Sequence, residues 1–142
     1  MYRTNLGDLS PIISAHIYWE QKRHFQFKED RYDSWVVFVV EKGEFRYEIG
    51  SQTGFASFGE LVFCPPNTWF RREIVNPLTF HFILFSWKTP HPIHTCDWMP
   101  VGKISVNDHK RLISTYHYLR KLALLNDQQS VEWKNHLLFD IL

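Results

Sequence analysis

Short runs of hydrophobic residues, separated by turn-forming residues, dominate the chain between positions 34 and 87. The strongest runs are residues 35–40 (WVVFVV) and 80–85 (FHFILF), which consist almost entirely of β-branched and aromatic side chains. Turn residues separate such runs at Lys42-Gly43, Gly50-Ser51, Gly54, Gly59, Pro65-Pro66-Asn67 and Asn76-Pro77. This pattern predicts a small all-β barrel or sandwich.

The residues before this stretch predict two further strands. Residues 12–19 alternate imperfectly between the two faces of a strand, and a polar turn follows at residues 20–22. Residues 23–28 alternate as a half-exposed strand does. We expect a charged loop over residues 29–34 and an N-terminal arm without regular structure over residues 1–11.

Beyond Trp87 the pattern changes to an irregular segment and then to helix. Three prolines over residues 88–100 predict an excursion long enough to cover or contact something. A helix follows, with Asn107 or Ser105 as its cap and Asp108 in its first turn.

A second helix is expected over residues 131–142, with Ser130 as its cap. Its apolar arc takes more than half of the circumference, which is more than one barrel surface covers. Because the sequence stops in the middle of a turn of this helix, we expect the chain to be a fragment of a longer protein.

Residues 59–67 (GELVFCPPN) carry a resemblance to a known superfamily. Gly59 and Pro65 stand at the spacing of the second conserved motif of the cupins, and Asn67 stands where a second glycine is usual. Asparagine tolerates the positive φ that we expect there. Within that superfamily, the chain resembles the N-terminal regulatory domain of AraC-type transcription factors, through residues 38–45 (FVVEKGEF), the Pro-Pro turn and residues 80–85. The resemblance covers residue 12 to the C-terminus.

The resemblance implies a mainly β fold, a cupin-like double-stranded β-helix (jelly roll) barrel followed by two C-terminal helices. The arm and barrel would occupy residues 1–100, and a helical dimerisation segment residues 101–142. DNA would be contacted only through a DNA-binding domain that is absent from this chain.

The same resemblance argues against a metal-dependent enzyme. The family's glutamate ligand falls on Val36, its first two histidines on Asp30 and Tyr32 (or on Glu29 and Arg31), and its third histidine on Phe70. A metal site needs histidine and carboxylate ligands that converge, so we expect no metal, no cofactor and no enzymatic activity. His91, His94, Cys96 and Asp97 lie close together, but their spacing matches no standard zinc motif.

Other chemistry is also missing from the sequence. We find no Gly-x-Ser-x-Gly elbow, no Cys-His pair and no glycine-rich phosphate loop. His81 stands on a strand that is apolar on both faces, where we expect a buried, hydrogen-bonded histidine, whereas His109 and His117 belong to the surface of a helix.

Composition narrows the function classes further. The net charge is +1, from 16 basic and 15 acidic residues, which leaves no electrostatic signature of nucleic-acid binding. The two cysteines do not form a disulfide framework, and no signal peptide or long apolar segment is present. We therefore expect a cytoplasmic protein without membrane contact.

The candidate ligand site follows from the resemblance, in which a small effector binds at the mouth of the barrel. Arg31 takes the place of the loop arginine, Phe70 and Arg72 share an inner face, and Phe80 and Phe82 stand at positions that meet the effector. Aromatic walls with one or two arginines suit a sugar or other polyol, and equally a small aromatic or carboxylate compound. The effector's identity stays open.

The candidate dimer interface is the apolar stripe of the two helices, with Leu112, Tyr116, Leu119 and Leu138. The leading interpretation is thus the ligand-sensing and dimerisation domain of an AraC-type regulator. The alternatives are a small cupin enzyme (an isomerase or a dioxygenase) and a barrel that its own aromatic residues fill, acting as a dimerisation scaffold only.

Overall fold

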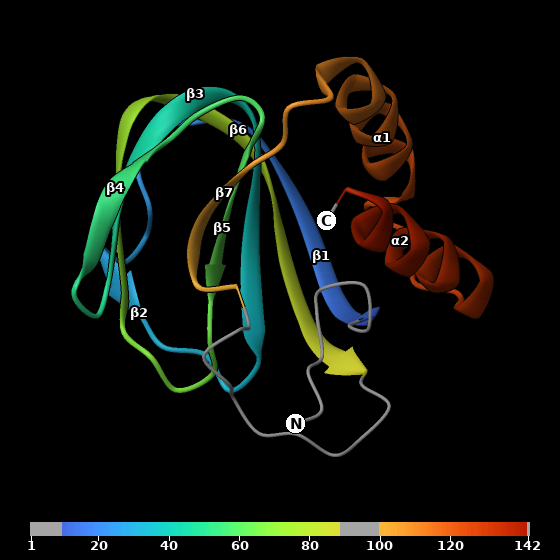
Figure 1. Ribbon diagram of the computed structural model, residues 1–142, viewed down its shortest axis with the longest axis horizontal. Coiled ribbons are helices and arrows are strands. Elements are labelled where there is room, and N and C mark those ends of the chain that lie inside the picture. The colour runs from blue at the N-terminus through green and yellow to red at the C-terminus, as the bar shows by residue number, and fades with distance from the viewer. Residues whose placement is uncertain (1–9, 89–99, 142) are drawn as a thin grey trace, which may run out of the picture.

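The structure is a computed structural model that describes residues 10–88 and 100–141 (Figure 1). In those residues the chain forms an antiparallel β-barrel followed by two helices. The strands are β1 (Ser10–Lys22), β2 (Glu29–Asp30), β3 (Trp35–Ile49), β4 (Gln52–Ala56), β5 (Glu60–Cys64), β6 (Phe70–Lys88) and β7 (Gly102–Ser105), and the helices are α1 (His109–Leu122) and α2 (Gln128–Asp140).

Two long strands, β3 and β6, pair along their length and belong to both sides of the barrel. The pairing runs from Trp35 opposite Phe85 to Ile49 opposite Phe70. At the first end, β1 extends the sheet beside β6, and β5 and β7 extend it beside β3. At the other end, β2 pairs with β6 and β4 pairs with β3. The barrel therefore has two facing layers, and the β3–β6 pair runs through both of them (Figure 1).

The paired strands β3 and β6, called here the β3–β6 ribbon, bend at Lys42-Gly43 and Asn76-Pro77, where the sequence predicted turns that end the strands. The two turn predictions are wrong, because both strands continue through the bend. The pairing of β3 with β6 shifts register between Val40 and Phe45, and Gly43 has a φ of +84°. Proline lacks the N–H of a ladder hydrogen bond and is tolerated at such a bulge. These residues bend two continuous strands and do not end them.

The other turn predictions have mixed outcomes. Gly50-Ser51 and Gly59 do form turns, and the prolines end β5 with Asn67 at a φ of +56°, as expected. Gly54, however, lies inside β4 opposite Tyr47. A Cβ at Gly54 would lie 2.8 Å from the Tyr47 hydroxyl, so this glycine gives room to a ring on the neighbouring strand.

The N-terminal strands differ from the prediction in extent. The strand expected over residues 12–19 is present as β1, but it continues through the expected turn to Lys22, with a register shift and a φ of +47° at Gln21. The strand expected over residues 23–28 is absent, and the nearest strand is the two-residue β2. Phe25 instead packs against the inner rings of Phe38 and Phe80.

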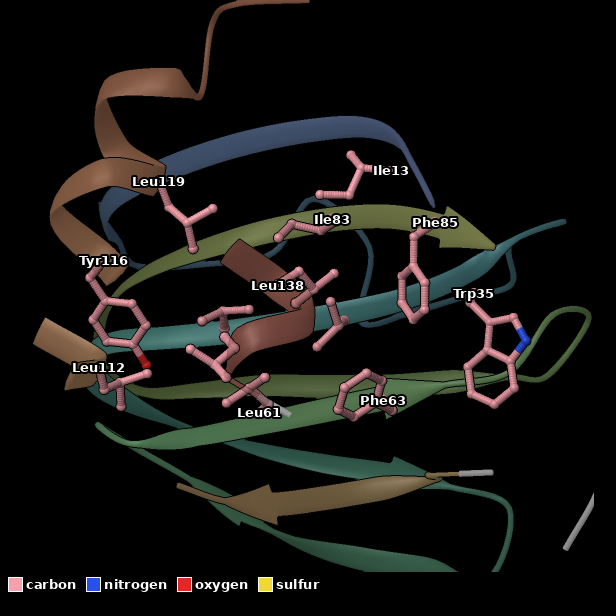
Figure 2. Packing of buried hydrophobic residues seen from close by; sticks show 13 residues of the cluster. Ile13, Trp35, Leu61, Phe63, Ile83, Phe85, Leu112, Tyr116, Leu119 and Leu138 are labelled. Carbon is pink, nitrogen blue, oxygen red and sulfur yellow. The ribbon is translucent and has the colours of Figure 1, made fainter. Parts of the chain in front are cut away.

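Two hydrophobic clusters form because successive side chains of a strand point to opposite faces. The inner cluster fills the barrel between its layers and contains Val36, Phe38, Val40, Phe45, Tyr47, Ile49, Ala56, Val62, Cys64, Phe70, Leu78 and Phe80. The outer cluster lies between the β1–β6–β3–β5 layer and the helices (Figure 2). Since both faces of residues 35–40 are buried, their sequence is continuously apolar.

Both helices begin at an aspartate, which corrects the expected caps. Asp108, and neither Asn107 nor Ser105, caps α1 and accepts from the Arg111 N–H. Asp127 caps α2 three residues before Ser130, whose backbone N–H and hydroxyl both donate to it. Neither described helix is long and apolar enough to cross a membrane.

The boundary expected at residue 100 does not separate barrel from helices. The strand β7 follows it and pairs with β5, from Glu60 opposite Ser105 to Phe63 opposite Gly102. Within the part of the chain that is described, the barrel therefore ends at Ser105 and the helical segment begins at Asp108.

The bend of the ribbon generates a prediction about stability. In Gly43→Ala, the new Cβ would overlap the carbonyl oxygen of Pro77 on the paired strand, at a residue that also has positive φ. We expect the free energy of unfolding to fall by roughly 3 kcal/mol or more. Urea denaturation measures the change.

The matched control is Gly50→Ala, where φ is also positive but a Cβ meets nothing within 4 Å. It should cost only the ~1 kcal/mol of the backbone conformation. Equal losses in the two variants would contradict the close approach of the bent strands.

Candidate functional site

A cavity of about 230 Å³ opens on the inner side of the barrel, between β1, residues 25–32 and the inner face of β6. The residues that line it are Ile17, Trp19, Lys22, Phe25, Gln26, Phe27, Asp30, Tyr32, Phe38, Arg72, Phe80 and Phe82. Alternation along the strands places Ile17 and Trp19 of β1, and Phe80 and Phe82 of β6, on the same side of their sheet. The deeper interior is filled by fully buried rings.

Arg72 is the most buried charged residue of this cavity, with a side chain only 6% exposed. Its guanidinium carbon lies 5.1 Å from the ring centre of Phe25, 5.6 Å from that of Phe70 and 5.9 Å from that of Phe38. Aromatic faces at such distances attract a cation. The surrounding rings thus hold a positive charge inside an apolar wall.

Not all of the N–H donors of Arg72 have hydrogen-bond partners among the described residues. One terminal nitrogen donates to the Tyr32 hydroxyl at 2.7 Å, and the other donates to the Phe27 carbonyl at 3.4 Å. The nearest carboxylate oxygen, on Asp30, is 3.9 Å away. Its Nε–H is buried and has no partner among the described residues.

Backbone hydrogen bonds fix the loop that carries Tyr32 and Asp30. The Arg72 N–H donates to the Lys28 carbonyl, and the Asn67 N–H donates to the Tyr32 carbonyl at 2.7 Å. Burial raises the pKa of Tyr32, although the hydrogen bond from Arg72 opposes this effect. Tyr32 therefore keeps its proton at neutral pH and can donate it.

The structure brings together three of the five residues predicted for the ligand site, namely Arg72, Phe80 and Phe82. Phe70 is fully buried below the guanidinium of Arg72 and does not line the cavity. Arg31 is exposed and stacks outside the barrel on Trp69, at 5.2 Å. The prediction that Arg31 lies in the wall of the ligand cavity is therefore wrong.

The sequence did not identify Tyr32, Asp30 or Phe25 as ligand-site residues. They belong to a segment without a repeating pattern, so periodicity gave no signal for the direction of their side chains. The unusual density of aromatic residues at positions 25, 27 and 32 was the available signal.

The four residues predicted for the dimer interface lie elsewhere than expected. Leu112, Tyr116, Leu119 and Leu138 are at most 2% exposed and pack on the outer face of the sheet within one chain. Figure 2 shows them directed at Ile83, Leu61 and Phe63. That stripe is an internal contact, and any pairing of the helices must use other side chains.

A second polar cluster lies on the outer face of the strands that form the cavity wall. The Nε2 atom of His16 is 2.8 Å from Nδ1 of His81, and Nε2 of His81 is 2.6 Å from a carboxylate oxygen of Glu41. Two neutral imidazoles with hydrogen on Nε2 satisfy both contacts, with His16 donating to His81 and His81 donating to Glu41. The expectation of a buried, hydrogen-bonded His81 is confirmed.

Both helices lie near this histidine cluster (His16, His81 and Glu41). From α1, Arg120 lies 3.6 Å from Glu41, and the Tyr116 hydroxyl donates to the Val40 carbonyl. From α2, the buried Lys134 donates to the Leu125 carbonyl and is close enough to influence His16. The cluster thus has a polar contact with α1 through Arg120 and Glu41, and Lys134 of α2 lies near it without a hydrogen bond to it among the described residues.

Burial favours the neutral form of both imidazoles in the histidine cluster. Together with smaller effects of His81 and Lys134, it lowers the pKa of His16 to about 3. Burial also lowers the pKa of His81, although Glu41 opposes this effect.

Two of the positions expected for cupin metal ligands hold side chains that cannot bind a metal. Val36 and Phe70 are fully buried in the inner cluster. Among residues 10–88 and 100–141, no three histidine, cysteine or carboxylate side chains form a group that could hold a metal ion. The His91–Asp97 segment lies outside the described residues.

Comparison with solved structures supports the fold. The chain is similar to the AraC-like transcriptional activator CuxR, with a TM-score of 0.51 and 13% identity over 97% of this chain and 53% of that one. The chain thus spans about half of CuxR, and at this identity the likeness shows a shared fold.

Two cupins match less well. A cupin-2 domain protein from Shewanella frigidimarina gives a TM-score of 0.39 and 17% identity over 58% of this chain and 72% of that one. An RmlC-like cupin with a double-stranded β-helix fold, from Methanocaldococcus jannaschii, gives 0.39 and 20% over 62% and 75%. No family model and no curated protein matches the sequence. The predicted fold class, a mainly β barrel followed by two C-terminal helices, is confirmed.

The histidine cluster predicts how stability depends on pH. Unfolded histidine has a pKa of about 6.5, so below that pH the unfolded chain binds protons that His16 and His81 refuse in the folded state. The free energy of unfolding should therefore fall with falling pH, by up to ~1.4 kcal/mol per pH unit for each histidine. For His16 this loss continues toward pH 3.

Urea denaturation between pH 4.5 and pH 6 tests this dependence. His16→Gln should make the slope shallower by ~1 kcal/mol per pH unit, since one of the two groups is gone. His117→Gln, at an exposed histidine of α1, should leave the slope unchanged. Identical slopes in all three proteins would contradict the neutral, buried pair.

Proposed function

We propose that the chain is the ligand-sensing and dimerisation part of an AraC-type transcription regulator and has no enzymatic activity. The observation that carries the proposal is a barrel that keeps an aromatic cavity around the buried Arg72, in a fold shared with the activator CuxR over 97% of this chain. In this proposal DNA is bound by another part of the protein, since the net charge of this chain is only +1. The cytoplasmic location expected from the sequence stays a prediction.

The cavity favours ligand sensing over the scaffold alternative. Phe38, Phe45, Phe70 and Phe80 fill the deep interior, yet the mouth beside Ile17 and Phe82 stays open. A scaffold would gain nothing from the buried charge of Arg72, because an incompletely paired charge inside a protein is costly. A negatively charged group of a ligand would pair with Arg72 and offset the cost of burying its charge.

The enzyme alternative has less support from the lining of the cavity. Its polar side chains include the donors Arg72, Tyr32, Lys22 and Gln26, and Asp30 is the one carboxylate among the described lining residues. A metal-dependent isomerase or dioxygenase would need ligands at the expected cupin ligand positions, and valine and phenylalanine stand at two of them. The cavity is better suited to hold a molecule than to transform it.

Dimerisation is proposed through the outward side of the helices. Between α1 and α2 lies a groove of about 450 Å³, lined by Tyr118, Lys121, Leu122, Trp133 and Leu137. Trp133 is 55% exposed and Tyr118 is 51% exposed, which is unusual for two large rings beside one groove. Large aromatic residues often anchor contacts between chains.

The first test of this proposal blocks the cavity. Ile17 lines the mouth and is 45% exposed, whereas Ile12 on the same strand is 43% exposed and lies outside the cavity. In thermal-shift screening against a library of small metabolites, a ligand at a hundred times its Kd should stabilise the parent by about 2.7 kcal/mol. Ile17→Trp should abolish this effect and Ile12→Trp should keep it.

Ligand sensing would be overturned if no compound of the library stabilised the parent. It would also be overturned if the stabilising compounds acted equally well on the Ile17→Trp protein. Because the two isoleucines have similar exposure, the two variants should be about equally stable without ligand. A difference in ligand response then reports the cavity itself.

The second test concerns the helices. Sedimentation velocity over a concentration series should show a monomer–dimer equilibrium in the parent and a shift to monomer in Trp133→Glu. Thr53→Glu, an exposed substitution on β4, is the control and should behave as the parent. A parent that stays monomeric at high micromolar concentration would contradict the dimer.

A further inference from the structure

The charges around the cavity are not balanced. Among the described residues, two cations, Lys22 and Arg72, line it together with one carboxylate, Asp30. The Asp30 side chain is 39% exposed and lies 3.9 Å from Arg72, and its other oxygen already accepts from the Arg31 N–H. Water therefore screens Asp30 far more than it screens Arg72, and a net positive charge remains in a low-dielectric site.

The polar groups around Arg72 include more hydrogen-bond donors than acceptors, which also favours an anionic ligand. A guanidinium has five N–H donors, and the structure gives two partners to that of Arg72, the Tyr32 hydroxyl and the Phe27 carbonyl. Tyr32 accepts from Arg72, and the Asp30 carboxylate competes with a ligand for its own hydrogen. Donors exceed acceptors at the polar end of the cavity.

The remaining wall is apolar. Seven of the twelve lining side chains are aliphatic or aromatic hydrocarbons or indole, namely Ile17, Trp19, Phe25, Phe27, Phe38, Phe80 and Phe82. The cavity volume of about 230 Å³ corresponds to roughly eight water volumes of ~30 Å³ each, below the range of drug-sized pockets. A compact molecule with one polar end fits this wall.

We propose that the ligand of this cavity is a small organic acid with one negative charge, whose carboxylate faces Arg72 and Tyr32 and whose apolar body lies against Trp19 and Phe82. This inference rests on the proposed sensing function and specifies its ligand class. A carboxylate accepts from the guanidinium fork and neutralises the uncompensated charge.

A neutral sugar fits less well. Each sugar hydroxyl needs acceptors as well as donors, and among the described lining residues the side-chain acceptors are Asp30, Gln26 and the Tyr32 oxygen. A neutral ligand would also leave the Arg72 charge uncompensated in the closed site.

Isothermal titration calorimetry of the full chain with benzoate, phenylacetate and hexanoate tests the ligand class, with benzamide and glucose as neutral comparisons. At least one acid should bind, and benzamide should bind at least tenfold more weakly than benzoate if benzoate is that acid. Arg72→Met should weaken the acid at least tenfold. Its thermal unfolding without ligand shows whether the variant is folded.

Asp30→Asn keeps the test decisive if Arg72→Met does not fold. Removing the one competing carboxylate should tighten binding of the acid three- to tenfold, a gain that a purely structural role of Asp30 would not produce. Glu29→Gln is the matched control, since it removes the same charge from the neighbouring residue, which lies outside the cavity. It should change the Kd less than twofold.

The outcomes separate the two proposals. If benzamide or glucose binds as tightly as the acids and Ile17→Trp blocks that binding, the cavity is a ligand site but the acid class is wrong. If Asp30→Asn weakens the acid, the charge argument is overturned. If none of the five compounds binds at millimolar concentration and the metabolite library also fails, both the ligand class and the sensing function are overturned.

Discussion

The pairing of β3 with β6 is the constraint on which the remaining structure depends. Each of the two facing layers contains one half of this ribbon, and every other described strand attaches directly or through β5 to one of its edges. The ribbon can enter both layers only because it bends at Gly43 and Pro77 without ending. One backbone conformation that favours glycine thus determines whether the barrel closes around an interior.

The bend also assembles the candidate site from distant parts of the chain. Arg72 lies on β6 before the bend, and Phe80 and Phe82 lie after it, so they come from opposite layers. Their side chains meet in one interior because the bend turns the inner faces of the two halves toward each other. The loop over residues 25–32 then adds Tyr32 and Asp30 at the open side.

Features that depend on local periodicity could be predicted from the sequence, and features that depend on packing partners could not. Alternation along β6 correctly placed Phe80 and Phe82 on one face and His81 on the other. The place of Arg31 was wrong because spacing within a motif does not define the course of a loop. Similarly, the stripe through Leu112 and Leu119 showed that a helix face is covered, but the sheet of the same chain covers it.

The wall between the cavity and the helices is a single sheet in thickness. Ile17 and Phe82 face the cavity, while their neighbours His16 and His81 belong to the cluster that contacts Arg120 of α1. Among the described residues, only the backbone of this sheet separates the two surfaces. A movement of β1 relative to β6 that alters the cavity wall therefore also alters the distance between the two imidazoles, so the shape of the interior is coupled to the surface that carries the helices.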